Sequence, residues 1–444
     1  MAQHTESGGT TNTATATNTD ETVAALSSYL DASPTPFHAC QQAAALLTAA
    51  GYARIVESDR FPTELGRYYL IRGGSLIAWN STAGTGSFRI VGAHTDSPNL
   101  RIKPQPDLMR AGWQLLGVEP YGGPLVNSWL DRDLGLAGRV ALRDGAGSRT
   151  ELVHITDPIL RVSQLAIHLH REVNEEGLRL NHQQHLAPHW GLGSAPGDFR
   201  GYLGDQVGAG ADDVLGWELM TVELTPARRI GRDRDLLASG RLDNLATSFA
   251  AVRALLDSDD SVAVGGSDHT RGIVLFDHEE VGSETAAGAA STLLPSVLER
   301  IVAAAGGDRE DYLRALAGTV IASGDMAHAI HPNYPERHEP EHPITINGGP
   351  VLKINNKGRY ATDAIGAAAF VLACEQATVP MQRFVTRSDL PCGSTVGPIT
   401  AARTGAVTVD FGAPMLSMHS AREVAGVHDQ PMYVAALAAF LAPA

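Results

Sequence analysis

Apolar and polar residues recur with two different periods along this chain, and the periods divide it into regions. Residues 21–50 show helical spacing on both sides of a break at ASPTPFHA, which predicts two helices. The run RYYLIRGGSLIAWN, residues 67–80, alternates around a Gly-Gly pair and predicts a β-hairpin. SFRIVGAHTDSP, residues 87–98, predicts a strand that ends in a polar loop.

A different pattern begins near residue 102. Short β-like runs such as GRVALRD and RTELVHI are separated by many turn signals. Residues 172–198 form a long stretch rich in Gly, Pro and His, without clear periodicity. We interpret residues 102–237 as an inserted, β-rich second domain that carries an extended loop.

From residue 238 onward, strands and helices alternate to the end of the chain. RLDNLATSFAAVRALLD is amphipathic, RGIVLFDHEE reads as a buried strand, and GTVIASGDMA and GAVTVDFG read as further strands between helical runs. This alternation predicts an α/β fold, a three-layer sandwich around a mainly parallel sheet. We expect one discontinuous α/β domain from residues 21–101 and 238–444, preceded by a disordered, Thr-rich tail at residues 1–20.

Length, composition and charge narrow the class of protein. The 444 residues suffice for two domains, and 43% hydrophobic with 19% charged residues is typical of a soluble globular protein. A net charge of -15 argues against nucleic acid and anionic membranes as partners. No window is apolar enough to predict a membrane span. Three widely separated cysteines indicate a reducing compartment, and we expect a cytoplasmic location.

The run FDHEEVGSET carries the first sign of chemistry. Glu279 and Glu280 follow the apolar run GIVLF after Asp277 and His278, at the end of a predicted buried strand. Two neighbouring carboxylates repel each other unless a cation or a proton lies between them. A divalent metal would satisfy both, with one acid as a ligand and the other handling a proton of water. Adjacent glutamates are also common on surfaces, so this pair alone would be weak evidence.

Other predicted strand and helix ends carry further groups that metals favour. Imidazole together with carboxylate suits Zn, Mn or Co, and the lack of cysteine ligands argues against a structural zinc site. Each residue has an ordinary alternative role, such as a loop histidine, a helix N-cap or a turn aspartate. Their joint occurrence at element boundaries makes a shared metal site the better explanation. The residues are His94, Asp96, Asp243, Glu280, Asp325 and His419.

Several ordered motifs resemble a known family. HTDSPNLRIKP, RLDN, DHEEVGS, SGDMAHAIHPNY, KINNKGRYATD, DLPCGSTVGP and MHSAREVAG look like the aspartyl aminopeptidase family of dinuclear zinc exopeptidases, from about residue 21 to the C-terminus. The resemblance implies a cytosolic metallo-aminopeptidase that removes the N-terminal residue, preferably Asp or Glu, from short peptides.

The resemblance also implies roles for the candidate residues. Asp243 would bridge two Zn²⁺ ions per subunit, with Mn²⁺ or Co²⁺ as alternatives, and would have a cis peptide bond to Asn244. Glu279 would be the general base, and Asp96 would orient the imidazole of His94. The remaining ligands would be His94 and Asp325 for one ion, and Glu280 and His419 for the other.

Further residues follow from the same resemblance. Lys353 and Tyr360 would recognise the acidic substrate side chain, although Lys353 could equally be an ordinary surface lysine. His168, in the inserted domain, would contribute to activity in its own or a neighbouring subunit's site, through substrate or metal. His328 and His331 would make subunit contacts, in a particle of twelve subunits built through the inserted domain.

Three alternatives remain open at this point. One is an aminopeptidase of the same family that prefers neutral or basic residues. Another is a related dizinc deacylase or carboxypeptidase, which would not require a free α-amine. The third is a non-enzymatic scaffold on a peptidase fold, which would be favoured by an eroded ligand set or by replacement of Glu279.

Overall fold

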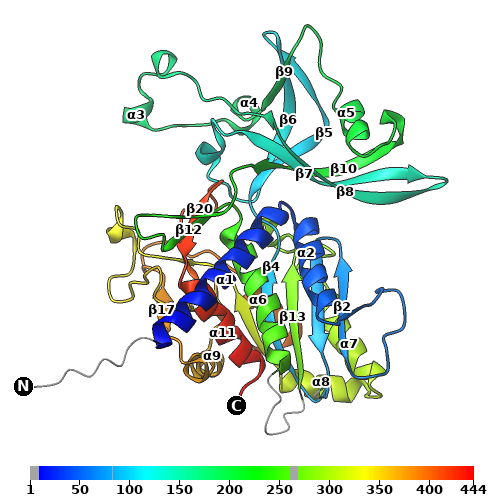
Figure 1. The fold of residues 1–444 in the computed structure, drawn as a ribbon, viewed down its shortest axis with the longest axis vertical. Helices are drawn as coiled ribbons and strands as arrows, with labels where there is room; N and C mark the ends of the chain where they lie inside the picture. Colours follow the sequence, from blue (N-terminus) through cyan, green and yellow to red (C-terminus); the bar gives the residue numbers. More distant parts are fainter. Residues whose placement is uncertain (1–9, 83, 261–268) are drawn as a thin grey trace, which may run out of the picture.

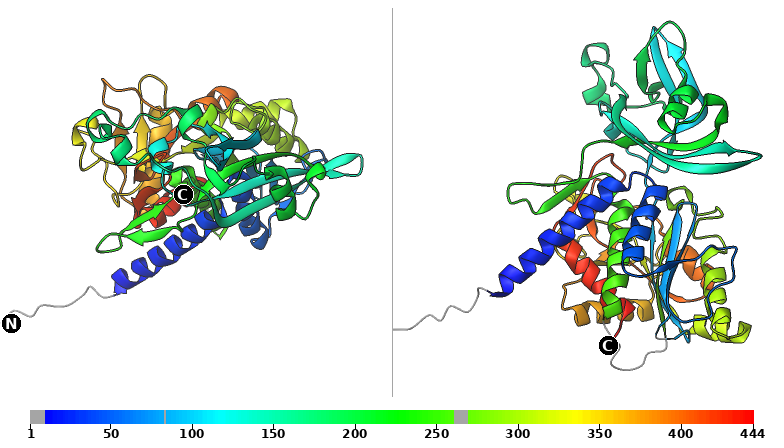
Figure 2. Two further views of the ribbon diagram at one scale, coloured as in Figure 1. Left: turned by 90° about the horizontal axis from the view of Figure 1, so that it is seen from above. Right: turned by 45° about the vertical axis from the view of Figure 1, so that its right-hand side comes forward.

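The computed structural model describes residues 10–82, 84–260 and 269–444. It has an α/β body and a β-rich body that lies over one end of it (Figures 1 and 2). The strands of the main sheet lie side by side in the order β1 (Ala53–Arg54), β2 (Arg67–Arg72), β3 (Ser75–Asn80), β13 (Thr270–Phe276), β4 (Phe88–His94), β14 (Val320–Gly324), β18 (Val407–Gly412), β16 (Val351–Ile354) and β17 (Gln382–Val385). The central strands β13, β4, β14 and β18 are parallel, while antiparallel neighbours occur at β2–β3, β3–β13 and β16–β18. The predicted α/β class with a mainly parallel sheet is therefore confirmed.

Helices cover both faces of this sheet and complete three layers. One face packs against α1 (Thr10–Ala32), α2 (Pro36–Ala49), α6 (Leu242–Asp260), α9 (Ala364–Ala377) and α11 (Asp429–Leu441). The opposite face packs against α7 (Leu293–Ala304), α8 (Arg309–Ala317) and α10 (Val396–Thr404).

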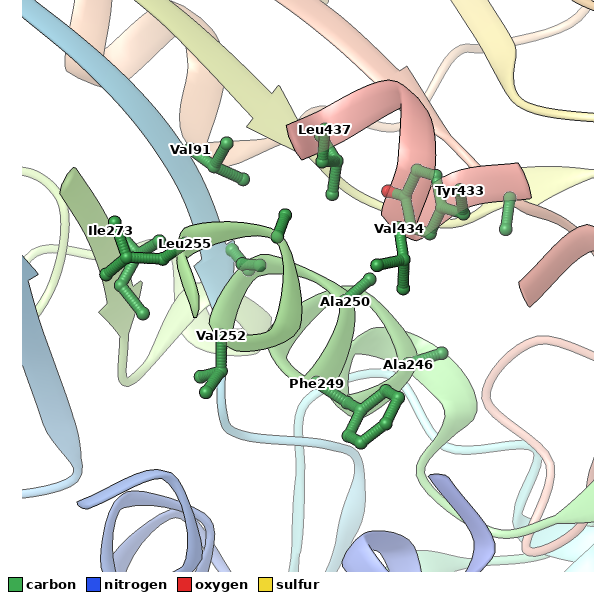
Figure 3. Close-up of a cluster of buried hydrophobic side chains, with 14 of the residues drawn as sticks. Val91, Ala246, Phe249, Ala250, Val252, Leu255, Ile273, Tyr433, Val434 and Leu437 are labelled. Atoms are coloured by element: carbon green, nitrogen blue, oxygen red, sulfur yellow. The ribbon is translucent and has the colours of Figure 1, made fainter. Parts of the chain in front are cut away.

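The side chains of β4 show how the strand pattern creates two cores. Successive residues of a strand point to opposite faces, so Phe88 and Ile90 enter one core while Val91 and Ala93 enter the other. Figure 3 shows α6 packed against the sheet and beside α11 through this second core. Each fully buried large apolar side chain contributes about 1.5–3 kcal/mol. This packing fixes the start of α6, where a candidate ligand lies.

The inserted domain is an antiparallel sheet with a core of its own. Its strands lie in the order β8 (Gly147–Leu160), β7 (Leu134–Asp144), β10 (Val214–Glu223), β5 (Asn99–Arg110), β6 (Trp113–Tyr121) and β9 (His189–Leu192). The Gly-, Pro- and His-rich stretch contains only β9 and the short helices α3 (Val173–Glu176) and α4 (His182–His185), and α5 (Phe199–Gln206) follows it.

The edges of this domain differ from the predicted boundaries of 102–237. Its sheet begins at Asn99 and ends at Glu223. The last part of the predicted insert, from residue 228 onward, instead belongs to a third sheet. Its pairing partner β20 comes from the far end of the chain, so a local sequence pattern could not predict this pairing. That sheet has the order β11 (Arg228–Ile230), β12 (Leu236–Ser239), β20 (Glu423–Gly426), β19 (Pro414–Leu416) and β15 (Ala327–His328).

The N-terminal segment also differs from its prediction. Residues 1–9 lie outside the described residues, but α1 begins at Thr10, within the segment expected to be a disordered tail. Buried Val23, Leu26 and Leu30 anchor the helix, and extending an existing helix is much easier than starting one. Across the described ranges, no helix has both the length and the apolar content needed to cross a bilayer.

Candidate active site

The candidate ligands meet at one edge of the main sheet. His94 is the last residue of β4, and Asp325 directly follows β14. Glu279 and Glu280 form a short 3-10 turn, η4 (Glu279–Val281), after β13. The carboxyl ends of parallel strands lie at a common edge, which is why residues far apart in sequence converge there. Asp243 at the start of α6 and His419 in the turn between β19 and β20 complete the cluster.

The ligand atoms form two groups that share Asp243. In the first group, His94 Nε2 lies 3.4 Å from Asp243 Oδ1 and 3.6 Å from Asp325 Oδ1. In the second, His419 Nε2 lies 3.5 Å from Asp243 Oδ2 and 3.3 Å from Glu280 Oε1. Within each group, all ligand atoms lie within 4.8 Å of one another. The Asp243–Asn244 peptide bond is cis, as the resemblance implied.

The donor set fits divalent cations. Among the described residues, Asp243 Oδ1 and Glu280 Oε1 are buried without a hydrogen-bond partner, and such oxygens are costly unless something positive satisfies them. Imidazole nitrogen and carboxylate oxygen are the atoms that zinc binds outside cysteine sites. A site with one carboxylate common to two groups can hold two ions.

The electrostatics of the cluster favour positive charge. Burial raises the pKa of Glu279 to about 7. His94 acts to lower this pKa, and the charges of the neighbouring aspartates act to raise it. Burial alone would lower the pKa of His94, but the neighbouring carboxylates of Asp243, Asp325 and Asp96 outweigh burial and hold this pKa well above its usual range. The surplus of carboxylates is therefore sufficient to bind cations in place of protons.

Asp96 supports both the histidine and the glutamates. His94 Nδ1 lies 3.0 Å from the Asp96 main-chain oxygen and 3.4 Å from its Oδ1. The Asp96 carboxylate also accepts hydrogen bonds from the main-chain N–H groups of Glu279 and Glu280, each at 3.1 Å. One buried carboxylate thus holds the imidazole and the adjacent turn in a fixed relation.

Glu423 is a site residue that sequence reasoning missed. Its buried carboxylate accepts hydrogen bonds from the main-chain N–H of Asp243 at 3.0 Å and of His419 at 2.7 Å. It therefore connects the backbones of two candidate ligands. The available signal was its place four residues after His419 in MHSAREVAG.

Two further contacts come from the inserted domain and were also missed. The Tyr121 hydroxyl donates a hydrogen bond to Asp96 Oδ2 at 2.7 Å. The main-chain oxygen of Gly123 lies 3.0 Å from His419 Nδ1. The only signal in the sequence is the turn-forming run YGGP, which by itself points to no site.

A cavity of about 430 Å³ opens onto the candidate ligands. Lys353 lines it and is buried, so it is not the ordinary surface lysine of the alternative interpretation. Its Nζ donates to the main-chain oxygen of Asp325 at 2.9 Å and lies 3.3 Å from Oδ2 of the same residue. Tyr360 also lines the cavity, with its ring centre 5.1 Å from Lys353 Nζ. The glycine-rich loop contributes residues 393–395, next to Cys392.

The other predicted residues lie at or beyond the cavity rim. His328 lines the main cavity and a neighbouring cavity of about 290 Å³, and His331 lines only the latter among the described residues. His168 lies in an exposed 3-10 turn of the inserted domain, η2 (Ile167–Leu169), and is not among the described lining residues. His278 Nδ1 lies 2.9 Å from Thr285 Oγ1, within the loop that follows β13.

Comparisons with known proteins agree with this geometry. A family model described as "Aminopeptidase I zinc metalloprotease (M18)" matches residues 29–441. A probable M18 family aminopeptidase 2 from Mycobacterium bovis is 54% identical over 423 residues, covering 94% of this chain and 97% of the relative. Ape4, solved in complex with Nbr1, superposes with a TM-score of 0.92 at 34% identity, over 98% of this chain and 87% of that one. The mApe1 dodecamer of S. cerevisiae gives a TM-score of 0.81 at 27% identity, over 95% and 97%. The predicted family is thereby confirmed at this level, and the chain belongs to the M18 family of zinc metallo-aminopeptidases.

Proposed function

We propose that this aminopeptidase uses two zinc ions to release N-terminal Asp or Glu from short peptides in the cytoplasm. The observation that carries the two-ion proposal is Asp243, whose two carboxylate oxygens face two different groups of candidate ligands. Both groups open onto one cavity that is large enough for an amino-acid side chain. The free thiols of all three cysteines agree with a reducing compartment.

The candidate ligands divide naturally between the two ions. His94 and Asp325 would hold one ion, Glu280 and His419 the other, and Asp243 both. When bound, such ions supply a water of lowered pKa and polarise the scissile carbonyl. The protein holds the ligand side chains in place through Asp96 and Glu423, which bind the ligand backbones.

Glu279 is proposed to move the proton. Its carboxylate faces the group of ligands that contains His94, with Glu279 Oε2 at 4.0 Å from His94 Nε2. Burial raises the pKa of Glu279, which helps its carboxylate to accept a proton, while cations bound nearby would act in the opposite direction. Glu279 would take the proton of the attacking water and deliver it to the leaving amine.

Lys353 is proposed to select the acidic side chain. An ammonium group has three N–H donors, and the two contacts with Asp325 leave one for a substrate carboxylate. Burial in the cavity wall strengthens this charge interaction relative to water. The alternative of a neutral preference has support as well, because Ile399 and Met418 give the cavity an apolar part.

The inserted domain is proposed to assemble the subunits into a dodecamer. The mApe1 relative is a dodecamer, and this chain exposes apolar residues around His168. Leu165, Ile167 and Leu169 are 56%, 46% and 75% exposed, and clustered exposure of this kind marks a protein contact surface. On this proposal, His168 reaches a neighbour's site while His328 and His331 make subunit contacts. Sedimentation of the wild-type protein would test it, and a monomer at micromolar concentration would refute it.

The function is tested with a panel of free dipeptides and aminoacyl anilides, with and without a chelator. The panel carries Asp, Glu, Leu or Lys at the first position. Chelator-sensitive release that favours Asp or Glu is the expected result. Release that favours Leu or Lys would retain the zinc mechanism and refute the acidic preference.

N-acetylated dipeptides separate the aminopeptidase from a deacylase. An aminopeptidase binds the free α-amine, so acetylation should abolish cleavage. Efficient release of acetate or of an acetylated residue from these controls would contradict the proposed function.

A further inference from the structure

One turn of the inserted domain reaches the candidate metal centre of its own chain. Strand β6 ends at Tyr121, which is buried, and the chain turns through Gly122 and Gly123. Tyr121 donates its hydroxyl hydrogen bond to Asp96 Oδ2 at 2.7 Å. Two residues later, the main-chain oxygen of Gly123 lies 3.0 Å from His419 Nδ1. The turn therefore contacts a support of the first metal group and a candidate ligand of the second.

These contacts constrain how the candidate ligands are presented. When the N–H at Nδ1 of a histidine donates to a carbonyl, the tautomer and ring orientation are set and Nε2 is left for a metal. His419 Nε2 is the atom that faces Asp243 and Glu280. Asp96, which Tyr121 holds, anchors the turn that carries both glutamates.

The turn is itself fixed from two sides. The guanidinium of Arg101 lies 3.6 Å from the ring centre of Tyr121, and the Leu125 N–H donates to the main-chain oxygen of His419 at 2.9 Å. Gly122 has a φ of +70°, and a Cβ added there would lie only 3.0 Å from Glu280 Cβ. Backbone and ligand are thus in close contact, and a side chain at position 122 would require Glu280 to shift by a few tenths of an ångström.

We infer that residues 121–125 are a positioning element for the metal centre, with Tyr121 as its positioning residue. The inserted domain then has a role inside its own subunit, apart from assembly, because its placement sets the geometry of both metal groups. This inference rests on the proposed zinc site.

The first test compares Tyr121→Phe with Tyr29→Phe. Tyr29 is also buried, but its hydroxyl donates to the main-chain oxygen of Ala39, which belongs to the hydrophobic core. Zinc affinity of the full-length apoprotein is measured by competition with a chromophoric chelator, and coordination is followed by the absorption spectrum of the Co²⁺-loaded protein. Loss of a group that directly holds a metal ligand typically weakens metal binding by about 10- to 100-fold, and Tyr121, which acts through Asp96, should fall toward the lower end of this range.

We expect Tyr121→Phe to weaken zinc binding to this extent and to change the Co²⁺ spectrum, with kcat lowered and KM retained. Tyr29→Phe should leave zinc affinity and spectrum unchanged, even if it lowers the melting temperature. Zinc affinity and Co²⁺ spectrum equal to wild type in Tyr121→Phe would overturn the inference.

The second test uses a matched pair of glycines in the same domain. Gly122→Ala and Gly112→Ala both place alanine at a positive φ, +70° and +82°, so they share the backbone cost. An added Cβ at Gly112 meets nothing within 4 Å, whereas at Gly122 it meets Glu280. Only Gly122→Ala should weaken zinc binding, and equal affinities of the two variants would overturn the inference.

The two tests also separate this inference from the function it rests on. A wild-type protein that binds no zinc would refute the proposed function and the inference together. A wild type that binds zinc, alongside variants with unchanged affinity, would refute only the inference.

Discussion

Replacing Glu423 with glutamine tests whether one buried carboxylate holds the metal ligands in position. Glu423 Oε2 accepts from the Asp243 N–H, and Oε1 accepts from the His419 N–H. Glutamine has the same shape but only one oxygen, so its NH₂ group must face one of these two N–H donors. The substitution therefore removes one hydrogen bond and places two donors against each other.

The expected loss of zinc affinity follows from the removal of this one hydrogen bond. Burial and the nearby Asp243 raise the pKa of Glu423 to about 8, and cations bound beside it would favour its charged form. A hydrogen bond to a charged group contributes about 1.5–3 kcal/mol. In the metal-free protein, the released turn can shift and let its N–H reach water, whereas zinc binding requires both ligands in their native positions. Most of the cost should therefore appear on zinc binding, as a loss of roughly 10- to 150-fold in affinity.

The assay is chelator competition on Glu423→Gln, with Asp259→Asn as its control. Asp259 also has a buried carboxylate, which accepts a hydrogen bond from Tyr52 at the opposite end of α6 from Asp243. The control should lose thermal stability but retain zinc affinity. If Glu423→Gln bound zinc as tightly as wild type and melted at the same temperature, the positioning role of this carboxylate would be wrong.

Three other predictions follow from the site and its surroundings. Glu279→Gln should retain two zinc ions by elemental analysis but lose about 10²- to 10⁴-fold in kcat, the usual contribution of a general base, and near wild-type turnover would contradict its role. Lys353→Met should lower kcat/KM for Asp relative to Leu substrates by about tenfold or more, since a charged hydrogen bond is lost, and an unchanged ratio would move the acid-recognising role elsewhere. Burial raises the pKa of Asp429 to about 7, despite hydrogen bonds from the N–H groups of Asn347 and Gly349. Because this folded-state pKa exceeds the unfolded value, the stabilising contribution is complete at low pH and is lost as pH rises through 7. The unfolding free energy of wild type should therefore fall relative to Asp429→Asn between about pH 4 and 8, and parallel pH curves for the two proteins would contradict this.

Much of the site could be predicted because its residues follow recognisable elements. Glu279 and Glu280 follow the apolar run of β13, and His94 ends the apolar run of β4. Parallel strands bring such ends together, so the periodic pattern and the residue types were sufficient to expect a shared metal site.

The supports of the site could not be predicted in the same way. Glu423 lies on β20, and its partners are main-chain N–H groups, which carry no signature in the sequence. Tyr121 belongs to another domain and acts through a single hydroxyl. The helix α10 was likewise missed, because its first residues lie in a glycine-rich run, and such runs predict a loop.

The spread of the ligands along the chain determines when the metal centre can form. His94 belongs to the first quarter of the sequence, whereas His419 lies 25 residues before the end of the 444-residue chain. The helix that carries Asp243 packs against α11, far along the chain from the strand that carries His94. Because a chain is synthesised from its N-terminus, neither group of ligands can be held in its native arrangement until α11 has been made and has left the ribosome. Metal loading therefore follows the synthesis and packing of α11, and a bound ion reports that elements from both ends of the α/β body have come together.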